Sequence, residues 1–511
     1  MEFILESTLG LESAHQRMII NIKKYRVNPK SVLFCEITLH IIDTTIKTIF
    51  LKRMESMKAF RYVLCVLVLA SIFMVPMKTV QATVTPLTTC LGVQNLEATT
   101  ADITINFYSQ TAGEAAIQVP DTILANEYKT FCNLSSLPSG FNGSAVISSS
   151  TRLGVIANVA NTNYSGMYGS YGGFSDGSQN ISLPVLMKSN YGYNTEYSVQ
   201  NVGTASTDVT VTYSDGVTLP AVTIESGRSH TFSQASESHV AGWVGSGTAS
   251  AAAGGLIVAA ALETNEQVMF AYNSFNNAIS PHTNPVFPLI QANSYGYISG
   301  MGIQNTSGTA TTVTVTYTPA SASYAACTET KSVPANGSAL FALNAWSSSD
   351  PDSANNTCVN GATFVGSGRV TSNSTNAPLV AVVNQLNGAA VKGAAYDSFN
   401  PDLATSTVVF PLIMDRNYGF FTGTNIVNVG TGAVDVTCVY SGVGSSYTGD
   451  KKLAMQPGDV ASFVQLNKIA NGYVGSAVCT ATGTNPKIIG VANQVASSAK
   501  DTFLAYEGIN N

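Results

Sequence analysis

The feature that most constrains the fold is a segment of about 30 residues that occurs three times in the sequence. It runs from Phe287 to Tyr317 as FPLIQANSYGYISGMGIQNTSGTATTVTVTY, with near-copies over 183–213 and 410–440. Each copy contains a proline among apolar residues, then Tyr or Asn with Gly, then Asn, and finally a run in which Val alternates with Thr or another residue. A repeat of this length indicates one folding unit used several times.

The repeat divides the chain into four units. An asparagine follows a strand-like run at positions 95, 201, 305 and 428, and a Gly-Ser pair precedes another strand at Gly143-Ser144, Gly245-Ser246, Gly366-Ser367 and Gly475-Ser476. The spacing of these landmarks predicts units of roughly 100 to 120 residues, a normal domain size. We place them at residues 83–181, 182–285, 286–407 and 408–511.

Within a unit the hydrophobic period is two, which is the pattern of a strand with one buried face. In Val313-Thr-Val315-Thr-Tyr317 every second residue is apolar, and β-branched residues favour strands. About seven such strands per unit, separated by Gly, Asn, Ser and Pro turns, predict tandem immunoglobulin-like antiparallel β-sandwiches. A jelly roll or a β-solenoid is the alternative, but a solenoid would have a much shorter period.

The N-terminal region is typical of an exported protein. Lys58 and Arg61 precede an apolar run over 62–75, and small residues before Thr83 mark a cleavage site, so 57–82 is interpreted as a Sec-type signal peptide. A membrane anchor is the alternative, although the run is short for a span and Pro76 follows it directly. Residues 1–56 resemble neither a signal nor the repeat and are interpreted as an extension from a start codon assigned too early.

Six cysteines follow the predicted signal peptide, and the first, third and fourth units each contain two: Cys90 with Cys132, Cys327 with Cys358, and Cys438 with Cys479. The second unit has none. Pairing within units is the simplest arrangement and requires an oxidising compartment. Cys438 and Cys479 align with core-facing strand positions, which predicts a bridge between the two sheets of the last unit. Buried free thiols are the alternative.

The charge of the chain argues against nucleic acid as a partner. Only 11% of residues are charged, and residues 83–511 contain 13 Lys and Arg against 24 Asp and Glu, a net charge of −11. Such a chain can neutralise few phosphates. No cofactor and no membrane span of the mature chain are expected.

Motifs for catalysis and metal binding are weak. Gly173-Phe-Ser175-Asp-Gly177 fits the G-x-S-x-G pattern of a nucleophile elbow, but it lies in a Gly/Ser/Tyr-rich loop without the required strand and helix. The histidines after residue 82 lack partners at metal-ligand spacing. Asp350 and Asp352 could offer oxygen ligands to calcium, yet an ordinary polar turn is favoured because the loop lacks the EF-hand pattern. No catalytic or metal-binding residue is predicted.

Four aromatic residues cluster with glycines between the first two units: Tyr164, Tyr168, Tyr171 and Phe174. Exposed rings of this kind stack on sugars or grip a partner protein. Packing across the junction of the two units is the alternative, and we favour it. Trp243 and Trp346 stand before the Gly-Ser landmark of their units and are expected to fill the core or its rim.

The pattern P-L-I…N-Y-G…Q-N…G…V-T-V-T-Y, followed by Gly-Ser and by A-V-V-N-Q at 381–385, resembles the tandem β-sandwich repeats of bacterial secreted and cell-surface proteins. The resemblance covers nearly all of residues 83–511. The first unit departs from it, because its proline strand is reduced to Thr85-Pro86-Leu87. The resemblance implies an extracellular location and a structural or adhesive role, and it carries no catalytic residues.

Three classes of function remain. We expect a secreted or cell-surface structural or adhesive protein without catalysis, whose partners are other surface proteins, further copies of itself or cell-envelope polysaccharide. A set of carbohydrate- or protein-binding modules is the first alternative, and a secreted hydrolase is the second. Short linkers that contain proline, such as 280–286 and 400–409, predict an extended string of units.

Overall fold

The computed structural model describes residues 87–161, 166–265, 267–342, 346, 356–442, 445–498 and 500–510. Within these ranges the protein is built of strands, with one 3₁₀ turn, η3 (Pro401–Leu403). No helix in this part of the chain is long and apolar enough to cross a membrane. The expected extension and signal peptide lie outside the described residues, as do Tyr164, Asp350 and Asp352.

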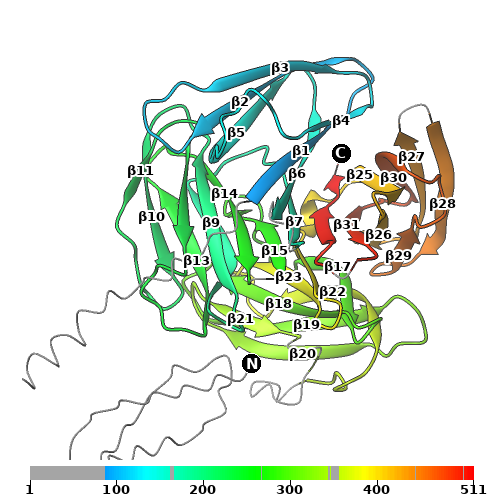
Figure 1. Ribbon diagram of the computed structural model, residues 1–511. Coiled ribbons are helices and arrows are strands. Elements are labelled where there is room, and N and C mark those ends of the chain that lie inside the picture. Colours follow the sequence, from blue (N-terminus) through cyan, green and yellow to red (C-terminus); the bar gives the residue numbers. More distant parts are fainter. Residues whose placement is uncertain are drawn as a thin grey trace, which may run out of the picture. The chain divides into compact units, whose positions relative to one another are not determined.

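The described strands form seven antiparallel sheets, which build four units that we call the first to fourth sandwiches (Figure 1). The first contains β1 (Leu87–Asn95), β2 (Ala101–Ser109), β3 (Ile117–Ile123), β4 (Tyr128–Phe131), β5 (Gly143–Ser149), β6 (Leu153–Asn161) and β7 (Tyr168–Gly172). The second contains β8 (Asn180–Lys188), β9 (Asn194–Asn201), β10 (Thr207–Tyr213), β11 (Val222–Ile224), β12 (Ser229–Ser233), β13 (Trp243–Ala251), β14 (Ile257–Thr264), β15 (Met269–Asn273) and β16 (Phe275–Asn276).

The third and fourth sandwiches repeat this order of strands. The third contains β17 (Val286–Ala292), β18 (Ile298–Asn305), β19 (Thr311–Pro319), β20 (Cys327–Val333), β21 (Ser338–Phe341), β22 (Phe364–Ser372), β23 (Leu379–Asn387) and β24 (Lys392–Asp397). The fourth contains β25 (Thr407–Asn417), β26 (Phe420–Asn428), β27 (Val434–Gly442), β28 (Ser445–Met455), β29 (Val460–Val464), β30 (Tyr473–Gly483), β31 (Ile488–Ala496), β32 (Phe503–Glu507) and β33 (Ile509–Asn510).

In the first three sandwiches, two separate sheets enclose the core. In the third sandwich the sheet β17-β22-β19-β20 faces the sheet β21-β18-β23-β24, and the second sandwich has the same order of equivalent strands with β16 added at one edge. In the fourth, β25 also pairs with β26, which joins both halves into one sheet. The all-β class and the antiparallel pairing expected from the sequence are therefore confirmed.

The Val/Thr run behaves as its period predicts. In β19 the side chains of Val313, Val315 and Tyr317 are fully buried, while the threonines between them face outward. Burial of each such side chain contributes on the order of 1.5–3 kcal/mol. The hydrophobic period thus sets which face of the strand forms the core.

The asparagine landmark fixes a turn in every sandwich. Each of these side chains is fully buried, donates to the carbonyl four residues later, and accepts a hydrogen bond from the backbone N–H two residues later. The residues are Asn95, Asn201, Asn305 and Asn428. Asparagine suits this position because one amide group can both donate to and accept from the backbone.

Three disulfides occur within sandwiches: Cys90–Cys132, Cys327–Cys358 and Cys438–Cys479. These are the pairs expected from the sequence. One expectation is wrong, because Cys438 and Cys479 are direct partners on the neighbouring strands β27 and β30 of one sheet. The bridge therefore fastens two strands of a single sheet and does not join two sheets.

Among the described residues, the first sandwich lacks one strand that the other three possess. In those three, the Gly-Ser strand pairs on one side with the proline strand, which is β8, β17 or β25. In the first, β5 pairs with β2, and no described strand pairs with its other edge. The side chains of β5 are correspondingly only half-buried or exposed, so this sandwich has the least protected core.

Four strands, one from each sandwich, lie side by side; we call β7, β15, β24 and β32 the central strands. Ser170 on β7 donates to the carbonyl of Ala505 on β32 over 2.7 Å. Just before β32, the carboxylate of Asp501 accepts hydrogen bonds from the N–H groups of Met269 on β15 and Gly393 on β24, both at 2.9 Å. Contacts among the central strands therefore connect all four sandwiches.

Serines of the Gly-Ser landmark and glutamines that precede the asparagine landmark form hydrogen bonds where sandwiches adjoin. Hydrogen bonds link Ser144 to the Gly227 carbonyl, Gln304 to the Gly247 carbonyl, Ser367 to the Gly458 carbonyl, and Gln94 to Ser476. The last of these joins the first sandwich to the fourth, and residues Thr85–Asn511 form one compact unit. The expectation of an extended string is therefore wrong, because the proline-containing linkers are combined with side-chain contacts that fold the units against one another.

Small-angle scattering provides a direct check of this compact unit. For the monomeric protein cut before Thr83, we expect a radius of gyration of about 22 Å, the value for a single compact body of this length. Four separate sandwiches in a line would give roughly 35 to 40 Å. A value in that upper range would contradict the contact between the first and fourth sandwiches.

Candidate functional site

Three exposed tyrosines occupy equivalent turns in the second, third and fourth sandwiches. Tyr191, Tyr295 and Tyr418 follow the proline strand and are 86%, 95% and 94% exposed. Each is followed by a glycine, and in the first two the N–H two residues after the tyrosine donates back across the turn, from Tyr193 to Asn190 and from Tyr297 to Ser294. A tight hairpin turn thus presents each ring to solvent.

The backbone at these tyrosines is in the left-handed region. Their φ angles are +48°, +50° and +48°, and the glycines that follow also have positive φ. Two-residue turns of this kind favour Asn or Gly at the first central position, because a Cβ there costs about 1 kcal/mol or more. A bulky aromatic residue at a strained position in three repeats indicates a role for the ring other than stability.

The central strands run in the same direction, and the three tyrosine turns lie near the end at which these strands begin. The residues that end these strands, Gly172, Asn273, Asp397 and Glu507, line one cavity, so the strands run in the same direction. Their opposite ends also meet, since Asp501 bonds to the start of β15 and of β24.

Each tyrosine turn is next to the loop that enters the central strand of its own sandwich. The Tyr295 carbonyl accepts a hydrogen bond from Asn387, and a Cβ placed on Gly192 or Gly419 would lie 3.9 Å from Asn265 or Ala496 respectively. Because these three loops enter central strands that run in the same direction, we infer that the three rings lie on one face, which we call the tyrosine face. Each ring also has an asparagine within two residues: Asn190, Asn293 or Asn417.

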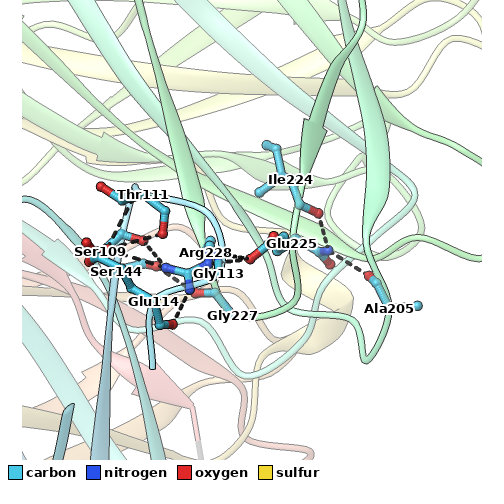
Figure 2. A network of polar contacts seen from close by, with 11 residues as sticks. Ser109, Thr111, Gly113, Glu114, Ser144, Ala205, Ile224, Glu225, Gly227 and Arg228 are labelled. Atoms are coloured by element: carbon cyan, nitrogen blue, oxygen red, sulfur yellow. Dashed lines mark hydrogen bonds and ion pairs between the residues drawn. The ribbon is translucent and has the colours of Figure 1, made fainter. Parts of the chain in front are cut away.

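A second group of polar residues lies between the first and second sandwiches (Figure 2). The buried Arg228 guanidinium donates to the carbonyls of Ser109 and Glu114 and pairs with Glu225 at 2.7 Å. Glu225 also accepts from the Gly113 N–H at 3.0 Å, and this bond, together with Arg228, holds the pKa of the Glu225 carboxyl below its usual value. These groups bond to one another, so the cluster fastens a junction and offers little to a ligand.

The predicted aromatic cluster has a different environment from the tyrosine face. Tyr168 packs edge-on against Phe420 of the fourth sandwich at a centroid distance of 6.0 Å. Tyr171 occupies the position of Tyr272, Tyr396 and Tyr506, whose hydroxyls bond to the carbonyl of the proline strand in their own sandwiches. Tyr171 has no such strand beside it among the described residues. Phe174 is half-buried in the loop after β7.

The remaining sequence candidates have structural environments. Ser175 is exposed and bonds only to the neighbouring Asp176. His239 stacks on Trp243 with a distance of 3.8 Å between the ring centroids, and Trp346 is buried in the core of the third sandwich. Within the described residues there is no group of three or more His, Cys, Asp or Glu that could hold a metal.

Comparisons with known proteins add no functional information. A scan against protein-family models gives no match, and a search of curated proteins finds no similar sequence. The candidate site therefore depends on geometry alone. Sequence reasoning missed the tyrosine face, although its signal, Tyr-Gly after Asn or Ser at the same place in three repeats, is visible in the printed sequence.

Proposed function

We propose that this protein is a secreted or cell-surface adhesive protein that binds neutral polysaccharide through Tyr191, Tyr295 and Tyr418. The observation that carries the proposal is the exposure of three rings at equivalent turns of three sandwiches, each at a cost in backbone strain. A tyrosine ring offers an apolar surface to the C–H face of a sugar and a hydroxyl to its polar edge. The neighbouring asparagines supply hydrogen bonds of the kind sugars need.

Repetition and charge favour a polysaccharide over other partners. Three equivalent rings suit a ligand that itself repeats, because simultaneous contacts add up to avidity. The net charge of −11 over residues 83–511 disfavours an anionic polymer. The disulfides suit an oxidising compartment, and export by the expected signal peptide belongs to the proposal. Catalysis forms no part of it.

Co-sedimentation with insoluble neutral glycans such as cellulose and chitin tests this function. Replacing one tyrosine by alanine should weaken binding about fivefold, since a stacked ring contributes on the order of 1 kcal/mol. The triple variant Y191A/Y295A/Y418A should lose roughly 100-fold. Failure of the unaltered protein to bind any neutral glycan would exclude polysaccharide as the partner and favour a protein ligand.

A matched set of variants separates binding from folding. Tyr191→Asn, Tyr295→Asn and Tyr418→Asn place a residue that tolerates positive φ in each turn, so each should stabilise the protein by a few tenths of a kcal/mol to about 1 kcal/mol. The same variants should lose glycan binding as the alanine variants do. Full binding by the stabilised triple variant would show that the tyrosine face is the wrong site.

A further inference from the structure

At the other end of the central strands a partly open cavity of about 200 Å³ lies between sandwiches. Each central strand has a tyrosine at the same position, and the residue after that tyrosine lines the cavity. These four residues are Gly172, Asn273, Asp397 and Glu507. Gly173, which is exposed, also lines the cavity, so the cavity opens to solvent at this residue. Acidic and amide side chains from three different sandwiches thus meet in one small space.

Hydrogen bonds at the cavity hold the Glu507 carboxylate and the Asn273 amide in place. The Glu507 Oε1 atom accepts a hydrogen bond from the Asp397 N–H at 2.6 Å, and Asn273 Nδ2 donates to the Gly172 carbonyl at 3.0 Å. A Cβ placed on Gly172 would lie 4.0 Å from Glu507 Oε2 and 3.8 Å from Asn273 Nδ2. The absence of a side chain at residue 172 leaves room between the groups.

Two side-chain oxygens of the residues that line the cavity have no hydrogen-bond partner. Asp397 is only 8% exposed, and its Oδ1 atom is buried without a hydrogen bond; the Oδ1 atom of Asn273 is in the same state. Among the described residues, no Lys, Arg or His lines the cavity. Burial and the Glu507 charge raise the pKa of Asp397 well above its usual value, and burial raises that of Glu507. Two buried carboxylates without a positive charge nearby destabilise the folded state unless they share a proton or bind a cation.

We propose that the cavity binds one calcium ion, with Asp397, Glu507 and the Asn273 amide oxygen as protein ligands and water completing the shell. Oxygen-only donors of mixed charge are the set that Ca²⁺ takes, and it accepts six to eight of them in irregular geometry. The ion would neutralise both carboxylates and satisfy the two orphan oxygens. Because the ligands come from the second, third and fourth sandwiches, its binding would fasten them together.

Thermal unfolding and terbium luminescence of the purified, chelator-treated protein test the site. Millimolar CaCl₂ should raise the midpoint by several degrees, since a ligand that binds only the native state stabilises it. Tb³⁺ should show emission sensitised by the adjacent tyrosines, such as Tyr396 and Tyr506, and Ca²⁺ should displace it. The variants Asp397→Asn and Glu507→Gln should weaken the apparent affinity at least tenfold while remaining folded, because each removes a buried charge.

A control variant and the alternative state of the carboxylates complete the test. The double variant Asp350→Asn and Asp352→Asn removes the two acidic groups that were considered from the sequence as calcium ligands. It should leave the effect of calcium on the unfolding midpoint unchanged. If the two buried acids instead share a proton, the midpoint will fall with rising pH and CaCl₂ will not change it. That result, or an unaltered calcium response in the double variant D397N/E507Q, would overturn the proposal.

Discussion

Replacing Asp501 by alanine should destabilise the protein by roughly 3 to 5 kcal/mol, the largest effect that we expect of a single substitution. The fully buried Asp501 carboxylate accepts from the N–H groups of Met269 and Gly393 in two other sandwiches. Alanine would leave both amides buried without an acceptor, and each unsatisfied group costs about 1–3 kcal/mol. Urea denaturation at pH 6 measures the loss.

Asp402 provides a matched control for this prediction. Its side chain is 77% exposed and lies 3.3 Å from His282, a surface contact that contributes little. Asp402→Ala should therefore change the free energy of unfolding by less than about 0.5 kcal/mol. Equal effects of the two substitutions would contradict the role of Asp501 as a link between sandwiches.

The strands and the cysteine pairs could be predicted because they depend on local pattern. Alternation in Val313–Tyr317 sets a buried face wherever the strand lies, and two cysteines per unit leave few ways to pair. The geometry of the Cys438–Cys479 bridge could not be predicted, since core-facing positions do not say which strands are neighbours. Register between β27 and β30 decides this.

The junctions were beyond sequence reasoning for a similar reason. Gln94 and Ser476 lie 382 residues apart in the sequence, and neither residue type indicates a partner at that distance. Ser476 belongs to the Gly-Ser landmark and Gln94 precedes Asn95, and these patterns give only the place of each residue within its repeat. The tyrosine face was hidden because a Tyr-Gly pair does not reveal positive φ until the hairpin register is known.

The stability of the protein should fall as the pH rises from 5 to 8, because several carboxylates are buried. Burial raises the pKa of Glu263 to about 8 and that of Asp501 to about 8. A folded-state pKa above the unfolded value means that the native state binds more protons in this interval. The stabilisation is therefore fully present below the unfolded pKa, near 4, and is lost as the pH rises through the folded value.

Glu263→Gln isolates the contribution of one group. Glu263 is fully buried on β14 and accepts a hydrogen bond from Asn384 of the third sandwich at 2.6 Å. Glutamine fits this position, because the equivalent residues of the third and fourth sandwiches are Gln385 and Gln494. The variant keeps a carbonyl acceptor for Asn384 but cannot ionise.

Urea denaturation of both proteins at pH 5, 6, 7 and 8 measures the difference. The free energy of unfolding of Glu263→Gln, relative to that of the unaltered protein, should increase by about 3 kcal/mol from pH 5 to pH 8. This is the free energy that corresponds to the raised pKa of Glu263 in the folded state. A constant difference between the two proteins would show that Glu263 ionises normally in the folded state. The Glu263 carboxylate would then have to be accessible to water. The contact of β14 with the third sandwich would be looser than the 2.6 Å hydrogen bond to Asn384 indicates.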